Sequence, residues 1–203
     1  MYQEFADKVK DIINDNIRCV HTAMPGKILT FDPDTCLATV LPTMKYKMPD
    51  GKTMPYPQIT GVPVMILETM KQQATVAFPI KPGDGCTIVV SEQALDYWQY
   101  GQETDTDLAF DLTNAICIPG LFVQPNPIVK AACEQNAIIV DVEGTKITVK
   151  KDLVQIDSKD IVINGDLRVN GQITASEDII ASDRISGTHH THMGVHGVTS
   201  PPL

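Results

Sequence analysis

From residue 138 onward, the chain repeats one short unit in which two apolar residues flank a single other residue. The unit returns about every six to seven residues, and polar pairs such as Asn164-Gly165 and Asn170-Gly171 separate its copies. The apolar pairs are Ile138 and Val140, Ile147 and Val149, Val154 and Ile156, Ile161 and Ile163, Leu167 and Val169, Ile173 and Ala175, and Ile179 and Ala181. A single chain cannot bury such a stripe, whereas three chains wound round one axis can. The pattern predicts a trimeric, intertwined β-helix or β-prism shaft over residues 126–185, with a single-chain solenoid or small sandwich as the alternative.

Residues 1–21 follow a different period. Their apolar side chains recur at intervals of three and four, with Asp, Lys and Asn between them, at Tyr2, Phe5, Val9, Ile12, Ile13 and Ile17. This spacing predicts an amphipathic N-terminal helix. We expect its apolar stripe to pack on the chain's own domain, and docking onto a neighbouring ring is the alternative.

Between residues 22 and 125, short β-rich runs alternate with turn residues. The runs cover residues 27–31, 36–41, 59–66, 74–80 and 86–91, and Pro, Asp and Gly cluster at Asp32-Pro33-Asp34 and Lys81-Pro82-Gly83. At least five antiparallel strands in about 70 residues are typical of a small closed barrel of the oligonucleotide/oligosaccharide-binding (OB) type. Because Pro125-Asn126-Pro127 cannot continue a ladder, we expect extended chain there and a domain border near residue 125. The predicted fold class is therefore mainly β, with an N-terminal helix and an OB-fold-like barrel before the shaft.

The net charge of the chain narrows the range of possible binding partners. The chain of 203 residues carries a formal net charge of −9, so three copies would carry −27. Binding to nucleic acid requires a basic surface, and we expect no nucleic-acid partner. The aromatic residues Tyr97, Trp98 and Tyr100 lie in an acidic stretch of the sequence, so we expect them to pack against a neighbour rather than to stack bases.

The five cysteines, Cys19, Cys36, Cys86, Cys117 and Cys133, are odd in number, scattered and without a C-x-x-C pair. This usage predicts small buried hydrophobes in a protein made in a reducing cytosol. The sequence opens without a secretory signal pattern. It also lacks the apolar run of about 18 residues that a spanning helix requires.

Histidines concentrate at the C-terminal end, where every histidine except His21 lies between His189 and His196. In extended chain, His190 and His192 lie on one side and His189 on the other. Two imidazoles are too few for a closed metal site, and no Cys, Asp or Glu follows Asp183. If three copies met on an axis, six imidazoles would form an octahedral cage, which suits iron, nickel or cobalt better than zinc. Residues 186–203 would then be a metal-binding apex with His190 and His192 as its ligands; the alternative is that the motif binds no metal.

The terminal run G-T-H-H-T-H-M-G-V resembles the G-x-x-H-x-H-x-G-V signature of central tail spike proteins of contractile-tailed phages, the baseplate assembly protein V family. Residues 22–122 resemble the same family through M-P-G-K-I, F-D-P-D-T-C-L-A-T-V, A-F-P-I-K-P-G-D and D-L-T-N-A-I-C-I-P-G-L. The resemblance implies a homotrimer with one iron ion at its tip, bound by six histidines, His190 and His192 of each chain. His189 and His196 fall outside the motif.

These expectations combine into a structural function rather than an enzymatic one. The resemblance implies a baseplate central spike that punctures the host outer membrane when the tail contracts. It implies hub or tail-tube proteins as partners, transient contact with the outer membrane, and a place in the virion after assembly in the host bacterial cytoplasm. A trimeric tail fibre or adhesin, or the spike of a phage-derived contractile injection particle, is the alternative. An enzyme using His190, His192 and His196 on a hydrolytic metal would need a nearby general base, and the tail has no carboxylate to supply one.

Overall fold

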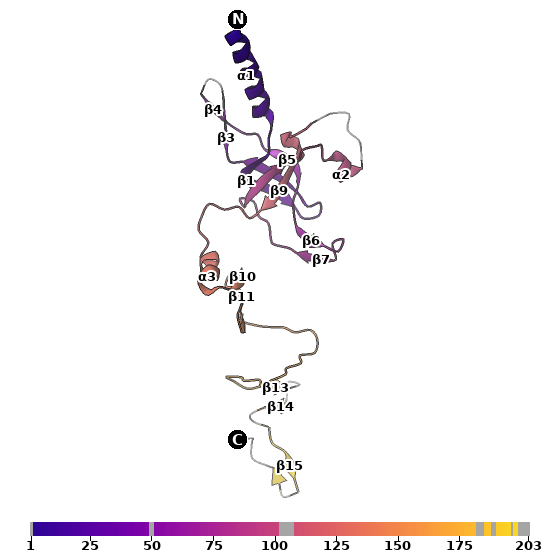
Figure 1. The fold of residues 1–203 in the computed structure, drawn as a ribbon. Helices are drawn as coiled ribbons and strands as arrows, with labels where there is room; N and C mark the ends of the chain where they lie inside the picture. The colour runs from indigo at the N-terminus through magenta and orange to yellow at the C-terminus, as the bar shows by residue number, and fades with distance from the viewer. Residues whose placement is uncertain are drawn as a thin grey trace. The chain divides into compact units, whose positions relative to one another are not determined.

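The computed structural model describes residues 2–48, 51–101, 108–181, 185–187, 190–195 and 197–198. The chain divides into two compact units, Met1–Lys130 and Ala131–Leu203. Strands form most of the regular structure in both units, so the expectation of a mainly β protein is confirmed. Figure 1 labels the elements along the chain.

The first unit opens with α1 (Tyr2–Cys19), which confirms the predicted N-terminal helix. Its apolar side chains are nevertheless exposed, including Phe5 at 69% and Ile12 at 61%. The expectation that the helix packs on its own domain is wrong for the single chain. The sheet that follows leaves no apolar face for the helix, because the apolar residues of the sheet already bury one another.

That sheet has five strands in the order β5-β2-β1-β8-β9, and each neighbouring pair is antiparallel. The strands are β1 (Ala23–Asp32), β2 (Leu37–Pro42), β5 (Ile59–Pro63), β8 (Gly85–Val90) and β9 (Ala115–Pro119). The sheet curls until its two edges meet, because Val64 forms a parallel bridge with Cys117. The Met65 N–H also donates to the Cys117 carbonyl at 2.8 Å. The result is a barrel-like domain of the kind the turn spacing predicted.

Alternation along the strands builds the core. In β2, every second residue is buried, which places Ala38 and Val40 inside and Thr39 towards the surface. The fully buried side chains Ile28, Val40, Val62, Cys86, Ile88 and Cys117 come from all five strands of the sheet. Gly85 is required by close backbone packing, because a Cβ atom there would overlap the carbonyl group of Leu121.

Two short hairpins lie outside this sheet. The first pairs β3 (Lys45–Lys47) with β4 (Thr53–Pro55), and the second pairs β6 (Leu67–Thr69) with β7 (Ala74–Val76). The predicted strand at 74–80 therefore does not join the barrel. Three successive residues with positive φ, Met70, Lys71 and Gln72, reverse the chain and pair residues 74–76 with the segment just before them.

Helices interrupt the strands at places that the sequence interpretation missed. They are α2 (Asp96–Tyr100), the 3-10 helix η1 (Leu112–Asn114) and α3 (Pro127–Gln135). Residues 125–127 were expected to stay extended. Instead, the Asn126 side chain accepts a hydrogen bond from the Ile128 N–H at 2.8 Å and caps α3, with Pro127 at the first helical position, where its missing N–H has no intrahelical partner to lose.

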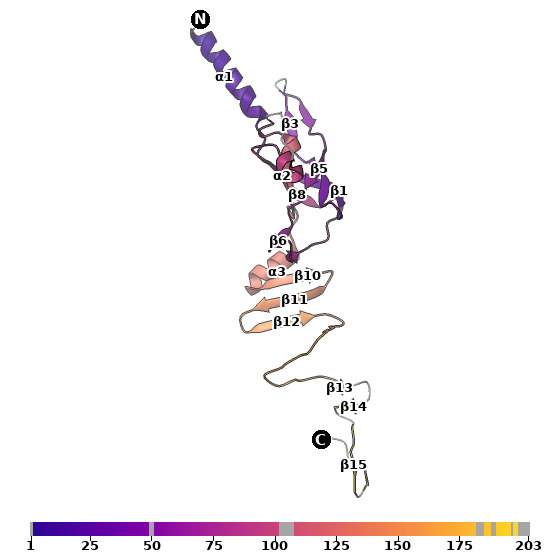
Figure 2. The ribbon, with the colours of Figure 1, turned by 90° about the vertical axis from the view of Figure 1, so that its right-hand side faces the viewer.

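In the second unit, β10 (Ile138–Val142), β11 (Thr145–Lys150) and β12 (Leu153–Asp157) form an antiparallel meander, seen clearly in Figure 2. Its turns are tight because Glu143, Gly144 and Asp152 take positive φ. The register sets Val140 beside Ile147 and Ile147 beside Ile156. This row across the sheet is therefore entirely apolar, as is the row of Ile138, Val149 and Val154, and all six side chains are exposed.

Among the described residues beyond β12 the single chain shows no β-helix, and the predicted shaft, which needs three chains, stays a prediction. Residues 158–178 contain no strand, and their repeat residues Ile161, Ile163, Leu167 and Ile173 are exposed. Short pairs follow, β13 (Ile180–Ala181) with β14 (Ile185–Ser186) and β15 (Met193–Gly194) with β16 (Gly197–Val198). In the single chain, residues 158–178 therefore have no cover for the apolar side chains of their repeats and no neighbouring strand for their backbone groups.

Candidate metal centre and apolar surfaces

The structure brings the two predicted ligands together. His190 and His192 directly precede β15, with ring centroids 5.1 Å apart and planes at 88°. His190 is half-buried and His192 is exposed. Thr191 between them is also exposed. His189 and His196 lie outside the described residues.

This spacing is compatible with one shared ion. Imidazole nitrogens bind first-row metals at about 2.1 Å, so two rings at right angles around one ion have centroids about 4.5 Å apart. The observed separation is 5.1 Å, so a shared ion would require the two rings to move closer together. Among the residues that the structure describes, no group of three or more His, Cys, Asp or Glu is placed to hold a metal. A single chain therefore contributes a pair of ligands, and a closed site needs further donors from outside it.

The buried sulfur pair is a different kind of feature. Cys86 and Cys117 lie fully inside the barrel on neighbouring strands. Hydrogen bonding to Cys86, together with burial, raises the pKa of the Cys117 thiol far above its usual range. Both side chains are fully buried in the hydrophobic core, so this pair serves as core. Cys36 and Cys133, in contrast, are exposed, and the expectation that they are buried is wrong.

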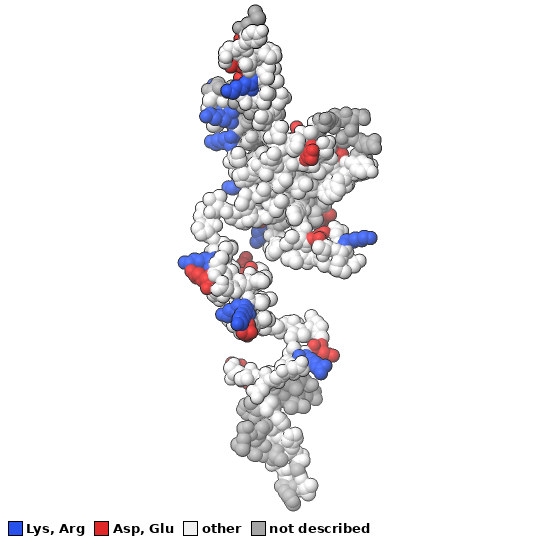
Figure 3. Space-filling view, in the orientation of Figure 1, with Lys and Arg blue, Asp and Glu red and all other residues white. Residues whose placement is uncertain are grey.

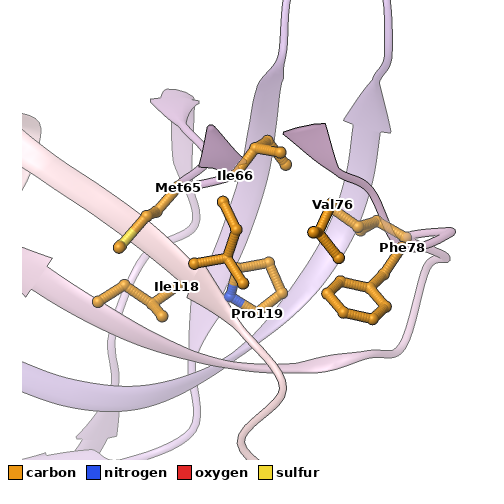
Figure 4. A pocket seen from close by; sticks show the side chains of 8 residues that line it. Met65, Ile66, Val76, Phe78, Ile118 and Pro119 are labelled. Atoms are coloured by element: carbon orange, nitrogen blue, oxygen red, sulfur yellow. The ribbon is translucent and has the colours of Figure 1, made fainter. Parts of the chain in front are cut away.

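An apolar groove of about 250 Å³ lies between the β6–β7 hairpin and β9. Figure 4 shows Met65 and Ile118 at one end, Val76 and Phe78 at the other, and Ile66 and Pro119 between them. No titratable side chain lines the groove. It can therefore hold an apolar surface but offers no chemistry for a reaction.

The aromatic cluster predicted to pack on a neighbour belongs to α2. Tyr97, Trp98 and Tyr100 are all exposed, with Trp98 at 70%. Trp98 shares a surface hollow with Pro63 and Val64, at the place where the sheet closes. In the view of Figure 3, most basic side chains of the first unit lie on its left side and most acidic ones on its right side, where Figure 1 labels α2. The aromatic rings are not set among clustered cations, which is what stacking on single-stranded nucleic acid requires.

The fold and its surfaces define a barrel-like domain and a second unit with a three-stranded sheet and exposed apolar repeats. Residues 24–120 match the family described as Phage protein Gp138 N-terminal domain. The matched range contains all five strands of the barrel-like sheet except the first residue of β1. No curated protein matches the chain. The comparison thus supports the expectation that the chain is a phage protein.

None of the described helices is long and apolar enough to cross a membrane. The longest, α1, is 18 residues and carries charged side chains along its length.

Proposed function

We propose that this chain is the central spike of a phage tail baseplate, a homotrimer that punctures the host outer membrane when the tail contracts. The observation that carries the proposal is the uncovered apolar row Val140, Ile147 and Ile156 on the β10–β12 sheet, followed by exposed apolar repeats to residue 179. Exposed apolar surface of this extent favours association. The match of residues 24–120 to a phage protein domain supports a role in a phage particle.

The repeats favour three copies of the chain over an unrelated partner. Every unit from residue 138 to residue 181 presents the same apolar-x-apolar face, so a second and third copy would offer a complementary surface at every level. Strands from the other copies would also satisfy the backbone groups of residues 158–178, which pair with no strand of their own chain. A stiff shaft with an apolar axis and polar walls would follow.

The apex would then carry a metal. Three copies would bring His190 and His192 together as six nitrogen donors, the octahedral set that iron accepts. The His190–His192 separation of 5.1 Å in one chain is compatible with neighbouring positions on one ion. The ion would be structural, tying three chains together where the shaft is too narrow for a hydrophobic core. It would have no role in catalysis.

The barrel-like domains would form a collar, with hub or tail-tube proteins as partners and the outer membrane as a transient contact. The protein would be assembled in the host bacterial cytoplasm and act in the virion. The runner-up is a trimeric tail fibre or adhesin, or the spike of a phage-derived contractile injection particle, because both use repetitive β-shafts. An adhesin requires a recognition surface, which the exposed α2 aromatics would have to supply.

Native mass spectrometry of the untagged protein tests the proposal, since it resolves oligomer mass and bound metal together. A trimer carrying one iron is expected. The variant His190→Ala with His192→Ala should remain a trimer without metal, because apolar contacts hold the shaft. Thr191→Ala, between the two histidines, serves as the control and should keep both the trimer and its metal. A metal-free monomeric wild type would contradict the proposal.

A further inference from the structure

The exposed stripe of α1 follows a heptad pattern. Tyr2, Phe5, Val9, Ile12 and Asn16 are separated by steps of three and four, which places them on one seam as a and d positions. Ile13 and Ile17 widen the apolar face on one side of that seam. An isolated helix of this length is marginal in water. A heptad seam is the pattern that matches another helix of the same kind, because it repeats its apolar contacts at every turn.

Asn16 gives a second indication of the partner. It occupies an a position, and its side-chain nitrogen donates to the Ile12 carbonyl of its own helix at 2.9 Å. A single asparagine inside an otherwise apolar seam is a device by which identical helices fix their register and number. The broad face formed by the seam with Ile13 and Ile17 suits a bundle of more than two helices.

Charge favours copies of α1 over a lipid surface. The polar face mixes acidic residues such as Glu4, Asp7 and Asp11 with Lys8 and Lys10. Helices that lie on anionic membranes have polar faces rich in Lys and Arg, and α1 does not. Because its acidic and basic side chains nearly balance, several copies can approach with little repulsion even though the whole chain carries −9.

We propose that the apolar stripe of α1 is covered by the α1 helices of two further copies of this chain, in a parallel three-helix bundle that locks the N-terminal end of the trimer. This rests on the proposed trimeric function, since three chains joined by a common shaft hold their α1 helices at high effective concentration. The trimer is then tied at both ends, by α1 before the barrel and by the shaft after it.

Disulfide cross-linking in the full-length chain tests the bundle. In a background where Cys19, Cys36 and Cys133 are serine, Val9→Cys places a thiol on the seam and Asn14→Cys places one on the opposite face. Mild oxidation by copper phenanthroline should join most Val9→Cys chains in pairs on a denaturing gel, at least about tenfold more than Asn14→Cys chains, because the seam holds the thiols at high effective concentration. Adding Ile12→Asp to Val9→Cys should abolish the cross-link, and adding Asn14→Asp should not.

Native mass spectrometry of the same samples separates this proposal from the one it rests on. A trimer that cross-links through Val9→Cys but not Asn14→Cys supports the bundle. A trimer that does not cross-link at Val9→Cys overturns the bundle and leaves the spike proposal standing, with α1 free to dock on a different baseplate protein. A monomer without cross-links overturns both.

Discussion

Replacing Ile156 with lysine is expected to dissociate the proposed trimer. Ile156 lies beside Ile147 in the apolar row of the β10–β12 sheet and is 47% exposed in the single chain. Burying a whole isoleucine side chain stabilises by about 1.5–3 kcal/mol, so covering the exposed half is worth roughly 1 kcal/mol in each chain. Three equivalent positions raise the loss to roughly 3 kcal/mol for a trimer, before any cost of burying the lysine charge.

A loss of that size weakens association by about a hundredfold, since each 1.4 kcal/mol is a factor of ten. Sedimentation velocity over a concentration series measures the change. Gln155→Lys is the matched control, because it adds the same charge one residue away, on the opposite face of β12, where the side chain is already exposed. Circular dichroism should show that both variants keep the barrel-like domain folded. If Ile156→Lys and Gln155→Lys are equally trimeric, the apolar row is not the interface.

Two predictions concern the barrel-like domain itself. Gly85→Ala should lower the midpoint of thermal unfolding, because the new Cβ would overlap the Leu121 carbonyl group and overpacking costs about 1–3 kcal/mol. Gly171→Ala is the control, because the space around Gly171 is open. Equal midpoints for the two variants would contradict the close contact between Gly85 and Leu121. Hydrogen bonds from Thr35 and Thr113 hold the pKa of Asp32 and of Asp111 below the ordinary value. A carboxyl group whose pKa is lower in the folded state stabilises the fold at pH values above its unfolded pKa, and this stabilisation is lost as the pH falls through the folded-state pKa. In Thr35→Val, NMR titration should show a higher pKa for Asp32. An unchanged pKa would refute the role of the Thr35 hydroxyl.

Local pattern was a good guide to the elements and a poorer guide to their partners. The three-and-four spacing of α1 predicted the helix correctly, but which surface covers its stripe depends on groups far away in sequence or in another chain. The run 74–80 had the composition of a barrel strand. It pairs in a hairpin instead, because the left-handed turn at Met70, Lys71 and Gln72 brings residues 67–69 beside residues 74–76.

The segment Pro125-Asn126-Pro127 shows how a strong local signal can be misinterpreted. Two prolines so close together predict extended chain, yet proline is favoured at the first position of a helix and asparagine at the cap before it. The Asn126 side chain and the Ile128 N–H form that cap. The capping signal was present in the sequence, and the competing interpretation of proline as a breaker hid it.

The sequence by itself determined the strand and helix periods, the acidic charge and the concentration of histidines at one end, because these depend only on neighbouring residues. It also determined that His190 and His192 lie close together, since a single residue separates them. Only the tertiary structure decided that the five-stranded sheet closes through Val64 and Cys117, and that β8 pairs with β1 across more than half of the barrel sequence. Such contacts join residues far apart along the chain, and their energy depends on the packing of the whole domain.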